Sequence, residues 1–510
     1  MLQIKHLTIS HKKDLRVLLR DFSLVLAPGD KAVLLGEEGN GKSTLLKWIY
    51  DPALVADYVE AEGERICRGK AAWLPQELQP EERRQSVYGY FSACPAFWDS
   101  TPGELRRMAR ELGFPCELFY SEQPLSTLSG GERVKIQLAR LLLERPDVLL
   151  LDEPSNDLDM DTLDWLEQRI LAFEGVVLFI SHDETLIERT ANRIVLLEQL
   201  HHKTESRWSV SSLPYAAFRD ERRRSYDKQE QLATGERREE RKAMEKFRRI
   251  QQRVEHEQRV ISRDDPHGGR LLKKKMASVK ATQRRYEREH ENLTAFPEVE
   301  SAINIRLNRL QPLPAGRTVV ELELPELWTE DGGRLLAQNV RLTVRGPEKL
   351  CLIGNNGAGK STLLRRILRE LEVQTALRVC YMPQNYEELL DFEQTPTEFL
   401  APSGEKEAVT EARTCLGALR FTALETERPI GRLSGGQKAK LLLLRLTLSG
   451  ANVLVLDEPT RNFSPLSGPE IRGLLRAFPG AILSVSHDRK FIGEVCTRVL
   501  RLTEYGLEPV

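Results

Sequence analysis

Cysteine is scarce in this sequence. Seven cysteines are scattered among 510 residues, and no two of them are spaced as a Cys-x-x-Cys pair. Paired cysteines at short spacings build disulfide frameworks, zinc sites and iron–sulfur sites. Their absence argues against these three classes, and the scattered thiols favour a reduced, cytoplasmic protein.

Long apolar runs are missing as well. No run approaches the roughly 18 apolar residues that a membrane-spanning helix needs. The first ten residues, MLQIKHLTIS, alternate apolar and polar side chains like a strand and contain no signal-peptide core. We therefore expect no membrane segment and no transport path within the chain. The length is sufficient for two or more domains that each bury a core.

One stretch, Leu128–Asp159, carries the strongest pattern in the chain: LSGGERVKIQLARLLLERPDVLLLDEPSNDLD. It combines a small-residue turn at Ser129–Gly131, a helix with regularly spaced apolar residues, and an apolar strand that ends on Asp152 and Glu153. A strand that ends on two carboxylates brings charge to the edge of a sheet, where α/β folds bind ligands. Taken alone, the stretch fits an ordinary core strand that ends in acids equally well.

The same pattern occurs a second time in the chain. The stretch Leu433–Ser464 repeats it, and Asp457 follows Asp152 by 305 positions. Upstream, GEEGNGKST at residues 36–44 recurs as GNNGAGKST at residues 354–362. Several motifs repeated in the same order identify a tandem duplication.

Each copy contains a glycine-rich loop of the kind that binds phosphate. In the first copy an apolar strand, Lys31–Leu35, leads directly into the loop, and a helix follows from Ser43. The glycines let backbone N–H groups and the helix N-terminus approach a phosphate. Lys42 is then placed to reach the β- and γ-phosphates, and Ser43 to ligate Mg²⁺. The predicted ATP-binding residues of the two loops are Gly36, Gly39, Asn40, Gly41, Lys42, Ser43 and Thr44 in the first copy and Gly354, Gly357, Ala358, Gly359, Lys360, Ser361 and Thr362 in the second.

Five motifs follow one another in the same order in both copies: GxxxxGKST, a single Gln after a short strand, LSGG with Glu or Gln, an apolar strand with DEP, and SHD. In this order they resemble the ATP-binding cassette family, and the resemblance covers roughly four fifths of the chain. It implies an α/β fold with two P-loop ATP-binding-cassette domains, ATP and Mg²⁺ as cofactors, and ATP hydrolysis. We place the two cassettes at residues 1–205 and 301–510, with a linker at residues 206–300.

The two acids after each apolar strand suit phosphoryl transfer, which needs positioning and charge neutralisation. We expect Asp152 to hold Mg²⁺ and Glu153 to polarise the attacking water. His182, after the next strand, would sense the γ-phosphate, and Gln76 resembles the Q-loop of the family, although either residue on its own is more often an ordinary polar one. The predicted catalytic residues are Glu153, His182 and Gln76 with their repeats Glu458, His487 and Gln384, and the predicted metal ligands are Ser43, Asp152, Ser361 and Asp457.

The resemblance also implies that ATP closes the two cassettes head to tail. Site one then joins the first phosphate loop to the second LSGG motif, and site two joins the second loop to the first LSGG motif. The second copy departs from the pattern where Ser464 replaces Asp159, so we expect asymmetric coupling of the two sites. Trp328 is a better candidate for stacking on adenine than His11. The predicted signature residues are Ser129, Gly130 and Gly131 in the first copy and Ser434, Gly435 and Gly436 in the second.

The linker between the copies differs in composition from both of them. The whole chain has a net charge of −1, but Tyr215–Ala295 contains 23 Lys and Arg against 15 Asp and Glu. Apolar residues step by seven on either side of a break at residues 262–270, as in Phe247 to Val254 and Tyr286 to Leu293. This pattern predicts a long antiparallel α-helical hairpin that joins the cassettes. Its first arm, Tyr215 to Val260, would extend about 70 Å.

Basic residues crowd the predicted turn of the hairpin. Like charges packed at one tip repel unless phosphates neutralise them, so the pattern favours contact with nucleic acid over a plain solvated spacer. The predicted RNA-binding residues are Arg263, Arg270, Lys273, Lys274 and Lys275.

Two cassettes, a long basic hairpin and no membrane segment together resemble the ABC-F family. The resemblance implies that the partner is the ribosome, with its RNA and tRNA, and that the chain acts as a monomer whose own cassettes pair. The run DEPTRNFSPLSGP at Asp457–Pro469 resembles the antibiotic-resistance members of the Vga and Lsa kind. The alternatives are a housekeeping ABC-F translation factor, the twin ATPase subunit of an importer, and a DNA-handling ATPase, which would usually carry zinc-binding cysteine pairs or longer coiled coils.

Overall fold

The computed structural model describes residues 1–156, 158–200, 205–260, 273–278, 281, 312–329, 332–419 and 421–510, with the backbone alone at 254, 255 and 257–260. The chain divides into two compact units. One unit comprises Met1–Tyr215 with Glu300–Val510, and the other comprises Ala216–Val299. The first unit therefore holds both predicted cassettes, while the boundaries at 205 and 300 stay predictions.

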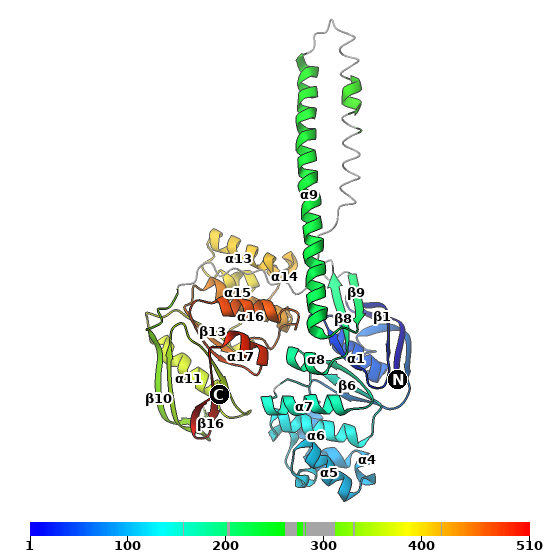
Figure 1. Cartoon of the computed structure of the whole chain (residues 1–510), viewed down its shortest axis with the longest axis vertical. Helices are drawn as coiled ribbons and strands as arrows, with labels where there is room; N and C mark the ends of the chain where they lie inside the picture. Colours follow the sequence, from blue (N-terminus) through cyan, green and yellow to red (C-terminus); the bar gives the residue numbers. More distant parts are fainter. Residues whose placement is uncertain are drawn as a thin grey trace. The chain divides into compact units, whose positions relative to one another are not determined.

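The first cassette is built on a six-stranded sheet in the order β5-β6-β7-β3-β8-β9 (Figure 1). Its central strands β3 (Lys31–Leu35), β6 (Val148–Asp152) and β7 (Val176–Ile180) are parallel, and every residue in them is buried. Burial on both faces explains why their sequences are continuous apolar runs. The remaining elements are β1 (Leu2–His11), β2 (Val17–Leu26), α1 (Lys42–Tyr50), η1 (Pro52–Leu54), β4 (Val59–Cys67), β5 (Ala71–Leu74), α2 (Pro80–Arg84), α3 (Val87–Ser92), α4 (Pro95–Asp99), α5 (Pro102–Leu112), η2 (Cys116–Tyr120), η3 (Leu125–Thr127), α6 (Gly130–Leu143), α7 (Met160–Ala172), α8 (Glu184–Thr190), β8 (Arg193–Leu200) and β9 (Glu205–Ser211).

The second cassette repeats this architecture with the strand order β13-β14-β15-β12-β16-β17. Its strand β14 (Val453–Asp457) pairs in parallel with β13 and β15, as β6 does in the first copy. The predicted two-cassette α/β fold is therefore confirmed. The remaining elements are β10 (Thr318–Trp328), β11 (Leu335–Arg345), β12 (Lys349–Ile353), α11 (Lys360–Glu372), β13 (Val379–Met382), η4 (Tyr386–Glu388), α12 (Pro396–Leu400), α13 (Lys406–Ala418), α14 (Ala423–Glu427), η5 (Ile430–Arg432), α15 (Gly435–Leu448), α16 (Gly468–Ala477), β15 (Ala481–Val485), α17 (Arg489–Val495), β16 (Arg498–Thr503) and β17 (Gly506–Pro509).

A smaller antiparallel sheet covers the phosphate-loop helix in each copy. The first copy has three strands in the order β2-β1-β4, and the second has only β10-β11. The second copy is ten residues shorter between Lys360 and Gln384 than the first is between Lys42 and Gln76. The shorter segment forms α11 and β13 and has no counterpart of β4.

One expectation about local structure was wrong. Ser129–Gly131 is not a separate turn, because helix α6 already begins at Gly130. Ser129 is its N-cap: its hydroxyl accepts the N–H of Glu132, and the Glu132 carboxylate accepts the N–H of Ser129 in return. This reciprocal capping lets two glycines, which disfavour helix interiors, start a helix.

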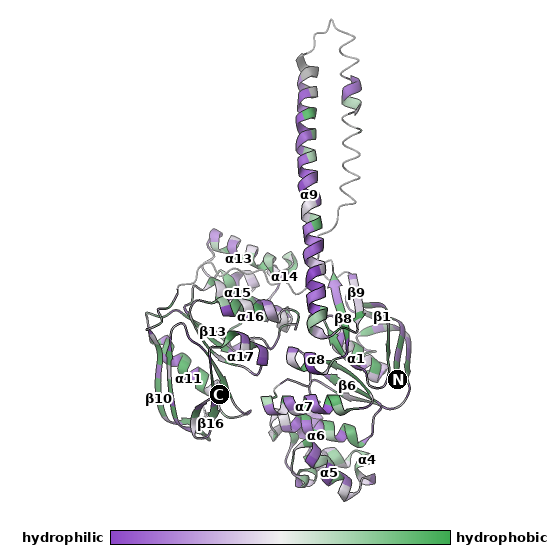
Figure 2. Cartoon of the chain, viewed as in Figure 1, coloured by the Kyte–Doolittle hydropathy of each residue, from purple (hydrophilic) through white to green (hydrophobic). Residues whose placement is uncertain are grey.

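The linker contains one long helix, α9 (Tyr215–Val260), which confirms the predicted first arm. Figure 2 shows it as mostly hydrophilic, in contrast to the strands of the cassettes. Residues 273–278 are also helical. The predicted turn at 262–270, with Arg263 and Arg270, and the apolar positions Leu272, Val279, Tyr286 and Leu293 lie outside the described residues. Within the described residues, no helix is both long enough and apolar enough to cross a membrane.

Candidate active sites of the two cassettes

Each phosphate loop connects a buried central strand to a helix. In the first copy, Gly36 has φ +149°, and a Cβ there would lie 2.3 Å from the carbonyl oxygen of Leu197. Gly41 adopts a left-handed conformation with φ +88° and caps α1. Only glycine fits such positions without strain, so the loop can fold tightly around a ligand at the helix N-terminus.

The lysine of each loop folds back onto its own backbone. The ammonium group of Lys42 donates to the carbonyls of Gly36 and Glu37 at 2.8 and 2.9 Å. Lys360 donates to Gly354 and Asn355 at 2.7 and 3.0 Å. The two copies thus hold a buried cation at the same place in the loop, where it can exchange a carbonyl for a phosphate oxygen.

The aspartates at the ends of β6 and β14 contact the hydroxyl residues of the loops. Ser43 Oγ donates to Asp152 Oδ1 at 3.0 Å. In the second copy burial raises the pKa of Asp457, and the hydroxyl of Ser361 opposes this rise. Burial raises the pKa of Asp152 to about 6. The hydrogen bond from Ser43 opposes this rise, and the negative charge of Glu153 adds to it. Asp457 Oδ1 is buried without a hydrogen-bond partner in the described part of the chain. Carboxylate and hydroxyl oxygens are ligands that Mg²⁺ accepts, so this donor set fits the metal.

The glutamates that follow differ between the two copies. Glu153 and Glu458 both have left-handed backbone, with φ of 52° and 51°. His182 Nε2 lies 2.8 Å from Glu153, whereas His487 Nε2 lies 3.8 Å from Glu458. Burial alone would raise the pKa of Glu153, but the charge and hydrogen bond of His182 prevail and lower it. Burial and the charge of Asp457 raise the pKa of Glu458 to about 8.

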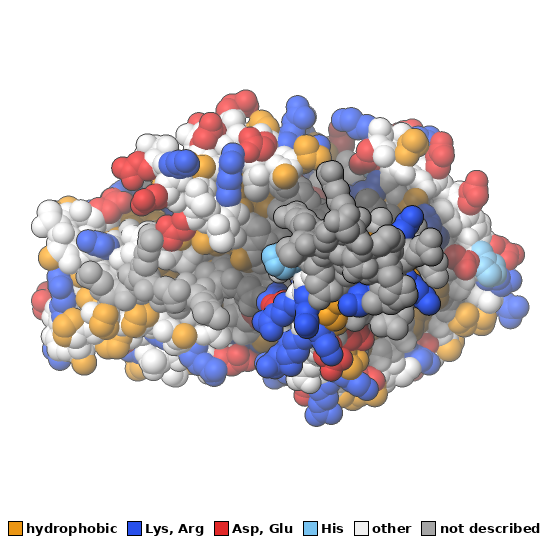
Figure 3. Space-filling model, turned by 90° about the horizontal axis from the view of Figure 1, so that it is seen from above, with side chains coloured by type: hydrophobic (Ala, Val, Ile, Leu, Met, Phe, Trp, Pro, Cys, Tyr) orange, Lys and Arg blue, Asp and Glu red, His pale blue; other side chains and the backbone are white. Residues whose placement is uncertain are grey.

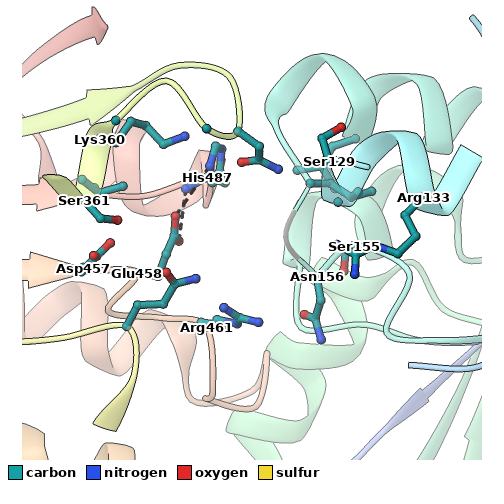
Figure 4. A pocket seen from close by; sticks show the side chains of 18 of the residues that line it. Ser129, Arg133, Ser155, Asn156, Lys360, Ser361, Asp457, Glu458, Arg461 and His487 are labelled. Atoms are coloured by element: carbon teal, nitrogen blue, oxygen red, sulfur yellow. Dashed lines mark hydrogen bonds and ion pairs between the residues drawn. The ribbon is translucent and has the colours of Figure 1, made fainter. Parts of the chain in front are cut away.

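Site two is an open cavity of 840 Å³ between the two cassettes (Figure 4). The second cassette contributes Lys360, Glu458 and His487, and the first contributes Ser129 and Arg133. The volume lies within the range of small-molecule sites. The structure therefore brings together residues that are more than 200 positions apart in the chain. The predicted site residues among its lining are Ser129, Gly130, His182, Gly357, Gly359, Lys360, Ser361, Thr362, Gln384, Asp457, Glu458 and His487.

Site one is closed by two acids of its own phosphate loop. Glu38 Oε2 accepts the backbone N–H of Gly436 at 2.5 Å, at the start of the second signature helix, α15. Glu37 lies 3.6 Å from the ammonium group of Lys440 and 3.5 Å from the hydroxyl of Ser467. These contacts bring the signature residues Ser434–Gly436 against the first loop.

Further contacts lie beside the catalytic residues of site one. His182 Nδ1 lies 2.6 Å from the carbonyl oxygen of Phe463 in the other cassette. A cavity of 120 Å³ lies beside Gln76 and Glu153, and Arg461 of the second cassette is part of its lining. The contacts of Glu37 and Glu38 therefore have to break before a nucleotide can lie between the first loop and the second signature motif, whereas site two is already open.

Several residues at these sites were not predicted from the sequence. Glu37 and Glu38 were visible in the loop motif, because the second copy has asparagine at both positions, but their contact with the other cassette was not. Arg334 and Arg461 line the cavity of site two. Trp328 does not line it: its indole N–H donates to Glu326, and its side chain is 44% exposed. Its role, like that of His11, stays a prediction.

Known proteins match the chain over both copies. The ABC transporter family matches residues 19–156 and 337–461. The ribosome protection protein VmlR of Bacillus subtilis is 30% identical over 94% of this chain and 83% of its own length. The energy-dependent translational throttle protein EttA of Escherichia coli is 28% identical over 96% of this chain and 90% of its own length.

Solved structures share the fold at lower identity. The archaeal ribosome recycling factor aABCE1, solved in complex with the ribosomal stalk protein aP1, is 17% identical with a TM-score of 0.60. The match covers 99% of this chain and 90% of that one. RNase-L Inhibitor gives a TM-score of 0.58 at 18% identity, over 99% of this chain and 90% of that one. Together with the duplicated motifs, these matches establish that the chain is an ATP hydrolase that belongs to the ABC-F family of tandem ATP-binding cassette proteins.

Proposed function

We propose that this chain is a cytoplasmic ribosome-binding ATPase that engages the ribosome with ATP bound and leaves it after hydrolysis, and that it protects the ribosome against an antibiotic. The relative named as a ribosome protection protein supports this proposal, because its similarity extends over the linker as well as both cassettes. The chain would act as a monomer, with its own two cassettes forming both ATP sites.

The charge of the linker is the observation that carries the proposal. From Tyr215 to Arg253, α9 contains 13 Lys and Arg against 8 Asp and Glu. Lys273–Lys275 are exposed too, and Figure 3 shows Lys and Arg side chains gathered in the lower middle of the face that it presents. A surface of this kind suits the phosphates of RNA. The exposed basic residues of α9 are Arg223, Arg224, Lys228, Arg237, Arg238, Arg241, Lys242, Lys246, Arg248, Arg249 and Arg253.

We assign the chemistry of each ATP site to matching residues in the two copies. Lys42 and Lys360 would bind the β- and γ-phosphates. The loop serine and the strand-end aspartate would hold Mg²⁺, which, when bound, neutralises charge on the phosphoryl oxygens. Glu153 and Glu458 would orient and polarise the attacking water, each supported by the histidine and the Q-loop glutamine of its own cassette.

The test uses the full chain with Glu153→Gln and Glu458→Gln together. Glutamine keeps the size and hydrogen bonding of glutamate but removes its charge, so ATP should still bind while hydrolysis stops. The variant should sediment with ribosomes through sucrose in ATP but not in ADP. Equal pelleting in both nucleotides would contradict a role for ATP in engaging the ribosome, and pelleting only with membranes would favour an importer subunit.

Resistance is tested separately from ribosome binding. A host that expresses the wild-type chain should tolerate a ribosome-targeting antibiotic better than a host that expresses the doubly substituted chain at the same level. If ribosome binding is found but no tested antibiotic loses potency, the housekeeping translation factor becomes the better assignment.

A further inference from the structure

A buried ion cluster joins the two cassettes away from the phosphate loops. Arg472 in α16 is only 2% exposed, and its guanidinium group donates to both carboxylate oxygens of Glu184 in α8, at 2.6 and 3.3 Å. It also donates to Glu494 of its own cassette at 2.9 Å. Helices α8 and α17, which carry Glu184 and Arg489, are in contact. A charged group this deeply buried is tolerated only with such complete pairing.

A second half of the cluster mirrors the first. Arg489 in α17 bonds to Glu167 in α7, and its other nitrogen lies 2.8 Å from Asp164. Glu167 in turn accepts from Arg189 of its own cassette at 2.9 Å. Arg489 also donates to Asp183 at 3.2 Å, and Lys490 lies 3.4 Å from Glu184, so each half joins basic side chains of the second cassette to carboxylates of the first. Each half also contains one arginine–glutamate contact within a cassette.

The two halves occupy equivalent positions of the duplicated sequence, with every charge reversed. Arg472 follows Glu167 by 305 positions, the offset that also separates Asp152 from Asp457. Arg489 and Glu494 follow Glu184 and Arg189 by the same offset. The two glutamates of the first cassette therefore correspond to arginines in the second, and Arg189 corresponds to Glu494. The catalytic motifs, by contrast, are the same in both copies.

We propose that this charge reversal determines which cassettes pair: a first cassette accepts a second cassette and rejects another first cassette. In the observed pairing, Glu184 meets Arg472 and Glu167 meets Arg489. If two first cassettes from different chains met in the same geometry, Glu184 would face the Glu167 position twice. Two second cassettes would likewise bring arginine against arginine. Like charges placed opposite each other at an interface strongly disfavour binding, and this is a common means of selecting partners.

Stability alone does not account for the cluster. Buried ion pairs can often be replaced by apolar side chains at no loss of stability, so their retention fits a role in specificity. The charges do not forbid a first cassette from pairing with the second cassette of another chain. The linker disfavours that arrangement, because it keeps the partner of the same chain at high effective concentration. The inference rests on the single-chain pairing proposed above, but not on ribosome binding.

The decisive variant combines Glu184→Arg with Arg489→Glu in the full chain. The contact of residue 184 with Arg472 and that of residue 489 with Glu167 then join like charges. In a pair of two first cassettes or of two second cassettes, the same positions become complementary. Sedimentation velocity without nucleotide should show the mass of one chain for the wild type and of two or more chains for the variant. We expect self-association to tighten at least about 100-fold, because two contacts change sign. Unfolding curves report whether the cassettes stay folded.

Two further variants separate pairing from misfolding. Glu184→Arg with Arg472→Glu and Glu494→Arg carries the same first substitution but restores opposite charges in both contacts of residue 472, so it should remain a single chain. Reversing the exposed pair Arg413 and Glu427 controls for altered surface charge and should also leave the mass unchanged.

The proposal is overturned if the Glu184→Arg, Arg489→Glu variant stays a single folded chain. It is also overturned if the restored variant self-associates as tightly as the Glu184→Arg, Arg489→Glu variant. Should the charge reversal prevent folding, the neutral pair Glu184→Gln with Arg489→Gln decides instead. These substitutions remove the attraction between the two cassettes of one chain at these positions and the repulsion between like cassettes of different chains. The neutral variant should therefore self-associate about tenfold more tightly than the wild type. An unchanged mass over the same concentrations would also overturn the proposal. None of these measurements requires ribosomes or hydrolysis, so their failure is distinct from failure of the proposed function.

Discussion

Replacing Glu38 with asparagine should strengthen ATP binding at site one. The Glu38 carboxylate accepts the Gly436 N–H at 2.5 Å, at a helix N-terminus that ABC proteins direct at the γ-phosphate. An incoming nucleotide has to break that contact and also meets the negative charge of the loop. The second copy has Asn356 at the equivalent position, and its site is open. The substitution therefore makes the first loop resemble the second at one of the two residues that differ in charge.

The expected size of the effect follows from the hydrogen bond that is weakened. A hydrogen bond to a charged group contributes about 1.5 to 3 kcal/mol, and a neutral acceptor contributes roughly half of that. The loss of about 1 to 1.5 kcal/mol from the closed state corresponds to about tenfold tighter ATP binding. ADP should gain less, because it places no γ-phosphate against the signature helix.

Titration calorimetry can measure this effect at one site at a time. In a K360A background, where site two contributes little, Glu38→Asn should lower the Kd for ATP more than the Kd for ADP. The reciprocal Asn356→Glu change in a K42A background is the matched control, and it should weaken ATP binding at site two. An unchanged Kd for ATP with Glu38→Asn would refute the view that this carboxylate competes with nucleotide.

Three other predictions test the loops and the linker. K42A and K360A together should weaken ATP binding in calorimetry by removing the charge contacts to phosphate, and a double variant with the parental Kd would contradict the assignment. Changing Lys273–Lys275 to glutamine should lower ribosome affinity and reduce its salt dependence, measured by pelleting with ribosomes from low to high salt. The basal ATPase rate is the control and should not change. An unaltered salt dependence would indicate that the linker is only a spacer. Gly36→Ala should reduce the free energy of unfolding by about 2 kcal/mol in a denaturant titration, because its Cβ would strike a carbonyl of β8. Gly29→Ala, at φ +88° with open space where its Cβ would lie, measures the cost of a positive φ without a collision.

Local sequence was sufficient to predict the framework of both cassettes. The strand Lys31–Leu35 was predicted with the bounds that the structure has, and the first arm of the linker was placed at the residues of α9. The shorter segment between Lys360 and Gln384, which can be counted in the sequence, accounts for the smaller antiparallel sheet of the second copy. These features depend on periodicity, length and glycine content, which are properties of contiguous residues.

Contacts between the cassettes could not be predicted in the same way. The contact of Glu38 with Gly436 joins residues 398 positions apart, and no local pattern indicates it. The reversed charges at Glu167 and Arg472 were present in the aligned repeats, but their meaning depends on knowing which helices face each other. The start of α6 was misjudged for a different reason: glycine disfavours helices, and only the capping by Ser129 and Glu132 overrides that preference.

The difference between Ser464 and Asp159 now has a physical explanation that the sequence alone did not offer. At site two, burial lowers the pKa of Lys360. The negative charge of Asp159, which belongs to the first cassette, is one of the charges that oppose this decrease. At site one, the acids belong to the phosphate loop instead, and Glu37 contacts the hydroxyl of Ser467 in the same turn as Ser464. An aspartate at 464 would add a third carboxylate to that turn and weaken the contact by repulsion. In both sites these acids come from the first cassette, but at site one they belong to the phosphate loop itself, whereas at site two Asp159 faces the phosphate loop of the other cassette. Because the acids of the first loop contact the second cassette at site one, while site two is open, the two sites are expected to bind ATP in sequence, with site two first.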